Sequence, residues 1–66
     1  MQYIKETRSG HPPYAREEIT RAEAEAQIGT TALQDAEDQV RRYKRDFPGI
    51  AVMVETGAGT YVGAQE

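Results

Sequence analysis

The spacing of apolar and polar positions near the N-terminus favours a strand followed by a loop. Residues 2–8 (QYIKETR) alternate with a period of two, and Tyr3, Ile4 and Thr7 are residue types that suit a pleated, half-buried surface. Residues 9–18 (SGHPPYAREE) contain a Ser-Gly pair and a Pro-Pro pair, which interrupt regular structure. We therefore predict a strand over 2–8 and a loop over 9–18.

Helical periodicity is clearest in residues 30–49 (TTALQDAEDQVRRYKRDFPG). Thr31 and Gln34 fit a capping box, acidic residues precede basic ones as the helix dipole favours, and a Pro-Gly pair ends the pattern. The apolar side chains recur at spacings of three and four and share one face: Leu33, Ala36, Val40, Tyr43 and Phe47. We expect this face to form the core together with Ile4, Val52 and Val54.

Residues 50–64 have the pattern of a β-hairpin. The run 50–54 (IAVMV) is followed by Gly-Ala-Gly at 57–59 and then by a second short strand, TYVGA, which is the arrangement of two strands joined by a tight turn. A strand that is apolar on both faces is typical of the interior of a sheet. We therefore expect 50–54 to be a central strand, with Met53 on the face that the helix leaves partly exposed or that a partner covers.

Residues 20–28 (TRAEAEAQI) support two interpretations. Ala, Glu, Gln and Arg are strong helix formers, and Glu17 and Arg21 stand at a favourable i,i+4 spacing. The same residues alternate with a period of two, which places small alanines on one side and charged side chains on the other, as in a strand beneath a helix. Propensity alone favours the helix, but it leaves both structures open.

Length and composition indicate one small domain over residues 1–66. A chain of 66 residues buries only about 60% of its unfolded surface, and such chains often add disulfides or metals. This chain has no cysteine, so packing alone or packing with oligomerisation has to stabilise it. It has no apolar leader segment and no run long enough to cross a membrane, so we expect a soluble, cytoplasmic protein.

No set of residues in the sequence matches a known catalytic or metal centre. His11 is the only histidine, and the glycines of GAGTYVG at 57–63 precede no helix whose N-terminus would hold a phosphate. A hairpin turn and a solvated loop residue are the simpler interpretations of these two features. We therefore expect a protein that is not an enzyme and that uses no cofactor or metal.

Two charged regions are candidates for partner binding. The first is basic and consists of Arg41, Arg42, Lys44 and Arg45 near the end of the predicted helix. Tyr43 lies among these residues and Phe47 follows them, but the place of both rings on the apolar face argues against a role in stacking. The second region is acidic and includes Glu23 and Glu25, whose carboxylates could imitate a row of phosphates. Each region is also explained by ordinary solvation, and the net charge of −3 disfavours non-specific nucleic-acid binding.

Three segments of the sequence, in this order, resemble parts of a known family. YIKET at the start, QIGTTALQDAEDQV in the middle and FPGIAVMVETGAGTYVGA at the end look like small phage anti-CRISPR proteins that inhibit type I CRISPR surveillance complexes. The hairpin pattern G-x-x-x-x-x-E-T runs from Gly49 to Glu55 and Thr56. The resemblance implies an antiparallel sheet with one helix across a face, and a protein that blocks target DNA by binding the RNA-guided complex without catalysis.

With this resemblance, the strand interpretation of 20–28 is preferred. We predict an α+β fold with the order β-β-α-β-β, and β-α-α-β-β as the alternative. The predicted function is stoichiometric inhibition of a host nucleoprotein complex through the basic region or through Glu23 and Glu25. Two other classes fit the residues: a nucleic-acid-binding accessory protein that uses the basic region, and a dimeric interaction or antitoxin-type module that covers the exposed sheet face with a second copy.

Overall fold

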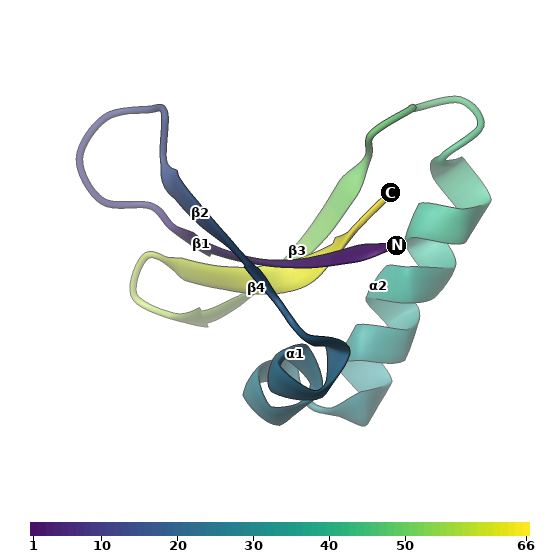
Figure 1. Cartoon of the computed structure of the whole chain (residues 1–66), viewed down its shortest axis with the longest axis horizontal. Helices are drawn as coiled ribbons and strands as arrows, with labels where there is room; N and C mark the ends of the chain where they lie inside the picture. Colours follow the sequence, from purple (N-terminus) through teal and green to yellow (C-terminus); the bar gives the residue numbers. More distant parts are fainter.

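The computed structural model describes all 66 residues, which form a sheet with two helices on one face (Figure 1). The elements in chain order are β1 (Gln2–Thr7), β2 (Ala15–Ile19), α1 (Arg21–Ile28), α2 (Thr30–Tyr43), β3 (Ala51–Gly57) and β4 (Thr60–Gln65). All strand pairs are antiparallel. The prediction of an α+β fold built on a small antiparallel sheet is therefore confirmed, with the element order β-β-α-α-β-β.

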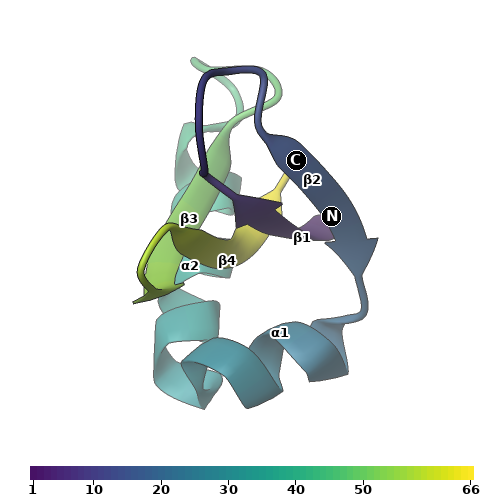
Figure 2. The same ribbon diagram turned by 90° about the vertical axis from the view of Figure 1, so that its left-hand side faces the viewer.

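The strands lie in the order β2-β1-β4-β3, so β2 and β3 are the two edges of the sheet (Figure 2). The prediction that 50–54 is a central strand is wrong. The last strand of the chain, β4, inserts between β1 and β3 and takes the central place. The apolar run of β3 has a different cause, because one face packs under α2 and the other lies on the inside of a curled sheet.

The segment 20–28 is a helix, so its assignment to a strand is wrong. The capping box that starts the helix lies at Thr20 and Glu23: the Glu23 N–H donates to Thr20 Oγ1 (3.1 Å), and the Thr20 N–H donates to Glu23 Oε1 (3.3 Å). The second strand lies earlier, at Ala15–Ile19, so the prediction of a loop over 9–18 is wrong from Ala15 onward. Intrinsic helix propensity and a favourable cap outweigh an alternation that alanine, with its small side chain, stabilises only weakly.

The second helix, α2, starts two residues earlier than a cap at Thr31 predicts, and it ends sooner than predicted. Gly29, with φ 86°, is both the C-cap of α1 and the N-cap of α2. No side chain caps α2, so the predicted capping box at Thr31 and Gln34 is wrong. Gly29 is the only residue between the two helices, and its positive φ lets the chain change direction there. The helix ends at Tyr43, and a turn closed by the Phe47 N–H to the Tyr43 carbonyl (2.8 Å) leads toward β3.

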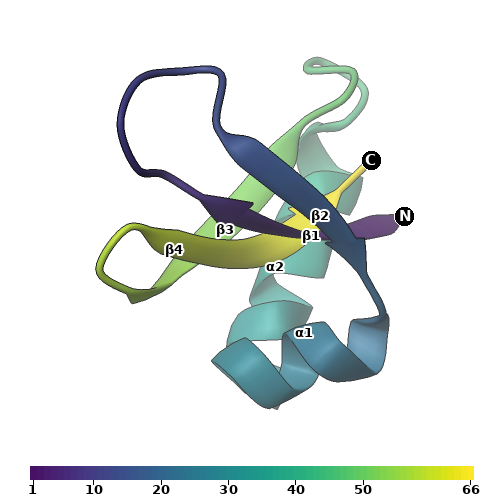
Figure 3. The same ribbon diagram turned by 60° about the vertical axis from the view of Figure 1, so that its left-hand side comes forward.

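Both helices lie on the same side of the sheet (Figure 3). The core between the helices and the sheet consists of two adjoining clusters. The fully buried residues are Ala24, Leu33 and Val62 in one cluster and Ala36, Val40 and Ala64 in the other. Tyr3 packs against both. The predicted core positions Leu33, Ala36, Val40 and Val52 are confirmed in this layer.

Three of the predicted core positions lie elsewhere. Tyr43 and Phe47 are 40% and 61% exposed, because Ile50 and Val52 already cover the Val40 end of the core. Ile4 is buried, but strand alternation places it on the opposite face of β1 from Tyr3. The helical period therefore predicts buried side chains correctly only for the part of the helix that lies over the sheet.

The face of the sheet opposite the helices is curled rather than flat. A Cβ atom added at Gly63 would lie 2.8 Å from the Met53 Cα and closer still to the Val52 carbonyl oxygen. Strand β3 therefore bends over Gly63, the register partner of Ile4, and Ile4 is only 7% exposed although no helix covers this face. We call this the concave face. Neither helix has the length and apolar character that crossing a bilayer requires.

Candidate binding surfaces

The predicted basic residues lie together on the last turn of α2 and the turn after it. We define the basic aromatic surface as residues 41–47 (RRYKRDF), all of which are exposed. Arg41 pairs with Asp38 one turn earlier, with 3.2 Å between Nη1 and Oδ1. Arg42 places its guanidinium carbon 5.9 Å from the ring centroid of Tyr43. Lys44 and Arg45 make no ion pair.

Aromatic exposure is the unusual property of this surface. Phe47 is the most exposed of the large apolar side chains, and Tyr43 is also among them. The prediction that both rings belong to the core is therefore wrong, and both are free to contact a partner. Four basic side chains and Asp46 give residues 41–47 a formal charge of +3. The net charge of the chain is −3, so the remaining residues together carry −6. A positive surface with exposed rings thus stands on an otherwise acidic protein.

The acidic candidates belong to α1, which lies beside the N-terminal part of α2 and away from the basic end (Figure 1). Glu23 closes the capping box with Thr20. Glu25 accepts a hydrogen bond from Arg21 Nη1 (3.2 Å). Both carboxylates already take part in contacts within the chain, so the structure does not present them as a free row of charges.

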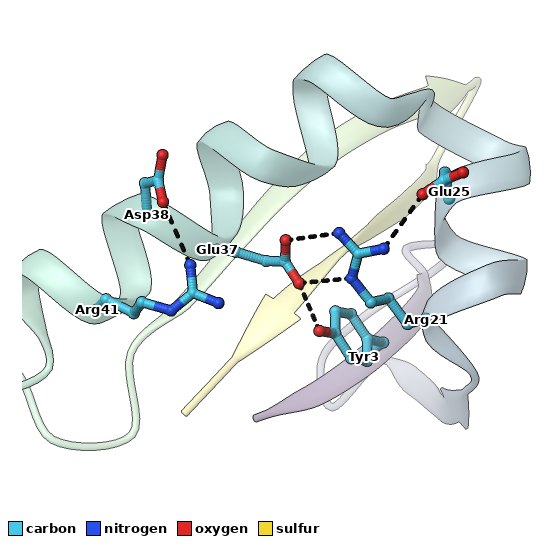
Figure 4. A network of polar contacts seen from close by, with 6 residues as sticks. All are labelled: Tyr3, Arg21, Glu25, Glu37, Asp38 and Arg41. Carbon is cyan, nitrogen blue, oxygen red and sulfur yellow. Dashed lines mark hydrogen bonds and ion pairs between the residues drawn. The ribbon is translucent and has the colours of Figure 1, made fainter.

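A buried carboxylate, which the sequence analysis did not single out, connects three elements (Figure 4). Glu37 on α2 is 4% exposed and accepts three hydrogen bonds: from Arg21 Nε (2.9 Å) and Nη2 (3.0 Å), and from the Tyr3 hydroxyl (2.5 Å). The Arg21 hydrogen bonds are the main reason that the pKa of Glu37 falls to about 2, while the hydrogen bond to Glu37 raises the pKa of Tyr3. We call these three residues the Glu37 network.

A second buried carboxylate lies on the concave face. Glu6 accepts hydrogen bonds from Arg8 Nε (2.6 Å) and Arg16 Nε (2.9 Å), which are the main reason that its pKa lies below the usual range. The Arg8 guanidinium carbon lies 3.9 Å from the ring centroid of Tyr61, whose hydroxyl donates to Glu55 (2.9 Å). These side chains cover the strands on this face and satisfy one another.

The polar atoms of both carboxylate networks are satisfied within the chain. Every buried polar side-chain atom of the chain has a hydrogen-bond partner, and no pocket is present at the surface. No three His, Cys, Asp or Glu side chains are grouped so that they could hold a metal ion. His11 lies exposed in the loop between β1 and β2. The basic aromatic surface and the sheet edges remain exposed outside these two networks.

The chain matches no protein-family model, no curated protein and no solved structure.

The sequence itself indicates one of the two networks, the Glu37 network. Glu37 follows Leu33 by four positions and Ala36 by one, so it borders the apolar face, and a carboxylate there requires a basic partner. That partner, Arg21, becomes identifiable only when 20–28 is recognised as a helix that precedes α2.

Proposed function

We propose that the protein acts without catalysis, by stoichiometric binding to a nucleoprotein assembly through the basic aromatic surface. The observation that carries the proposal is the exposure of Tyr43 and Phe47 among four basic side chains. Basic side chains attract phosphates, and exposed rings stack on bases or fill apolar pockets of a protein partner. A surface with both properties suits a partner that presents nucleic acid and protein together.

The charge distribution favours an assembly over free nucleic acid. Residues 41–47 carry +3, but the rest of the chain carries −6, which repels a long bare polyanion. In an assembly, guide or target phosphates are exposed over a short length and flanked by protein. The small positive surface can contact such phosphates while the acidic remainder of the chain faces basic protein.

The resemblance to phage anti-CRISPR proteins gives this proposal a specific partner. It implies a type I CRISPR surveillance complex in the cytoplasm of an infected bacterial cell, with target DNA excluded from the bound complex. An acidic alternative, in which Glu23 and Glu25 replace phosphates, has less support, because both residues are engaged within the chain. The basic aromatic surface is therefore the site that we assign to the partner.

The test is a binding measurement on a purified surveillance complex, with and without its target DNA. The variant Arg42→Gln with Arg45→Gln removes two charges from the surface without breaking an ion pair. The matched control, Thr31→Glu with Gln34→Glu, has the same net charge and changes exposed residues at the other end of α2. We expect tenfold or greater loss for the first, a change below about twofold for the second, and competition with target DNA.

Other outcomes separate the alternative functions. Equal binding of free DNA by the parent protein, measured by mobility shift, would identify a nucleic-acid-binding accessory protein instead. If the Arg42 and Arg45 variant binds the complex as the parent does, the basic aromatic surface is not the site. If the parent binds neither DNA nor the complex, the proposal is wrong.

A further inference from the structure

The two edges of the sheet differ in how they are protected against pairing. Edge strand β2 has the sequence AREEI, with charged residues at its three central positions, whereas β3 begins AVMV and has its only charge at Glu55. Charged side chains, prolines and bulges are the means by which proteins prevent edge strands from pairing with other chains. Strand β3 has none of these before its irregularity between Glu55 and Gly57.

The outer edge of β3 presents backbone groups with no partner. The Glu66 N–H donates to the Ile50 carbonyl (3.0 Å), and Val52 pairs with Ala64, so Ile50 and Val52 direct their ladder groups toward β4. Because these directions alternate along a strand, the N–H and C=O groups of Ala51 and Met53 point away from the sheet. The sheet ends at β3, and no hydrogen bond involves these groups.

The side chains of the same strand are only half-buried. All four residues from Ala51 to Val54 are intermediate in exposure on both faces of the sheet. The core beneath them is small, since its only large, fully buried side chains are Leu33, Val40 and Val62. A partner strand along β3 would cover apolar surface on both faces and give the unpaired backbone groups hydrogen bonds.

We propose that β3 pairs with β3 of a second copy of this chain, antiparallel about a two-fold axis at Met53. In that register Val52 lies opposite Val54 of the other copy, and Ala51 lies opposite Glu55 of the other copy. No like charges face each other, and the sheet becomes continuous across the two copies. The same operation at β2, centred on Glu17, would bring charged residues together at all three central positions of the strand and would bury no apolar side chain there.

The mass of the protein in solution, measured by sedimentation equilibrium without nucleic acid, tests the pairing. We expect the parent to sediment at twice the 7.4 kDa of one chain and the Met53→Lys variant at the mass of one chain, because two lysines would face each other at the axis. The control is Ala15→Lys, a lysine on the other edge strand, which should leave the mass of the dimer unchanged. A parent that remains at one chain mass, or a Met53→Lys variant that remains dimeric, would overturn the proposal.

A cysteine variant tests the register and does not depend on the behaviour of Met53→Lys. The chain has no cysteine, so a single Met53→Cys substitution can form a disulfide only between copies. Directly opposite Cα atoms of an antiparallel pair are about 5.5 Å apart, within the range that a disulfide spans. In oxidised glutathione we expect Met53→Cys to cross-link at least tenfold faster than a Glu17→Cys control on β2. Equal rates would show that Met53 does not lie on the axis.

Discussion

Arg21 donates two hydrogen bonds to Glu37, and this pair joins the first turn of α1 to the middle of α2. The Tyr3 hydroxyl adds a third from β1, so one carboxylate fixes two helices and the sheet relative to one another. The two helices meet at a single glycine and share few large apolar residues. The angle between them therefore depends on this polar contact as well as on the core.

Replacing Glu37 by Gln should destabilise the protein. The amide cannot accept from Arg21 and Tyr3 as the carboxylate does, and hydrogen bonds to a charged group contribute about 1.5–3 kcal/mol. We expect a loss of about 1–3 kcal/mol in the free energy of unfolding, measured by urea titration. The control is Glu25→Gln, which removes the exposed partner of Arg21 and should cost less than about 0.5 kcal/mol. Equal losses for the two variants would contradict this role of Glu37.

The same network predicts acid sensitivity. The pKa of Glu37 is about 2 in the folded protein and 4.5 ordinarily. A depressed pKa contributes stability that is fully present above pH 4.5 and is lost as the pH falls toward 2. Melting temperatures should therefore fall over this range in the parent, and the fall should be smaller in Glu37→Gln, which has no carboxyl group at this position. Identical pH profiles would show that Glu37 is not the group responsible. The pKa of Glu6 is also lowered, so Glu6 contributes to the acid sensitivity of both proteins.

The bend of β3 over Gly63 leads to a prediction about two glycines of the hairpin. In Gly63→Ala the new methyl group would meet the Val52 carbonyl and the Met53 Cα, so the strand has to move, and overpacking of this kind costs about 1–3 kcal/mol. At Gly57 nothing lies within 4 Å of an added Cβ. Gly57→Ala should therefore be neutral or slightly stabilising. Chemical denaturation of both variants distinguishes the two sites, and similar stabilities would contradict the bend.

Residue patterning predicted the class of the fold and several of its contacts. The alternation of 2–8 and the hairpin at 50–64 depend on local spacing, and Leu33, Ala36 and Val40 follow from the helical period. These features are set by neighbours in the chain, so the sequence contains enough information to find them. The basic cluster at 41–45 was also recognisable as a run of charges.

Other features depend on where distant segments meet. Tyr43 and Phe47 continue the period of α2, but Ile50 and Val52 occupy the space that these rings would need, and no local pattern reveals that competition. The central place of β4 likewise depends on how the ends of the chain pair. The error at 20–28 has a different origin, because the T-x-x-E pattern from Thr20 to Glu23 marks a helix start in the sequence, whereas the assignment followed the alternation and the resemblance.

That capping box gives a direct test of why α1 forms. Thr20→Ala removes the oxygen that accepts from the Glu23 N–H, and loss of an N-cap costs about 0.5–2 kcal/mol. Thr31→Ala is the matched control, since Thr31 lies at the start of α2, where no side chain forms a capping hydrogen bond. We expect the first variant to lose helical circular dichroism at a lower temperature than the second. Equal melting would show that propensity alone maintains α1.

The pair Phe47→Ala and Leu33→Ala separates the surface from the core. Leu33 is fully buried, and truncating a buried leucine costs about 2–5 kcal/mol, a large part of the stability of so small a domain. Phe47 is 61% exposed, so its truncation should change the free energy of unfolding by less than about 0.5 kcal/mol. We expect Phe47→Ala to melt like the parent but to bind the nucleoprotein partner at least tenfold more weakly, because an exposed ring contributes to contact and not to packing. A Phe47→Ala protein that melts at a lower temperature than the parent would show that this ring belongs to the core. One that melts and binds like the parent would show that the ring is not part of the binding surface.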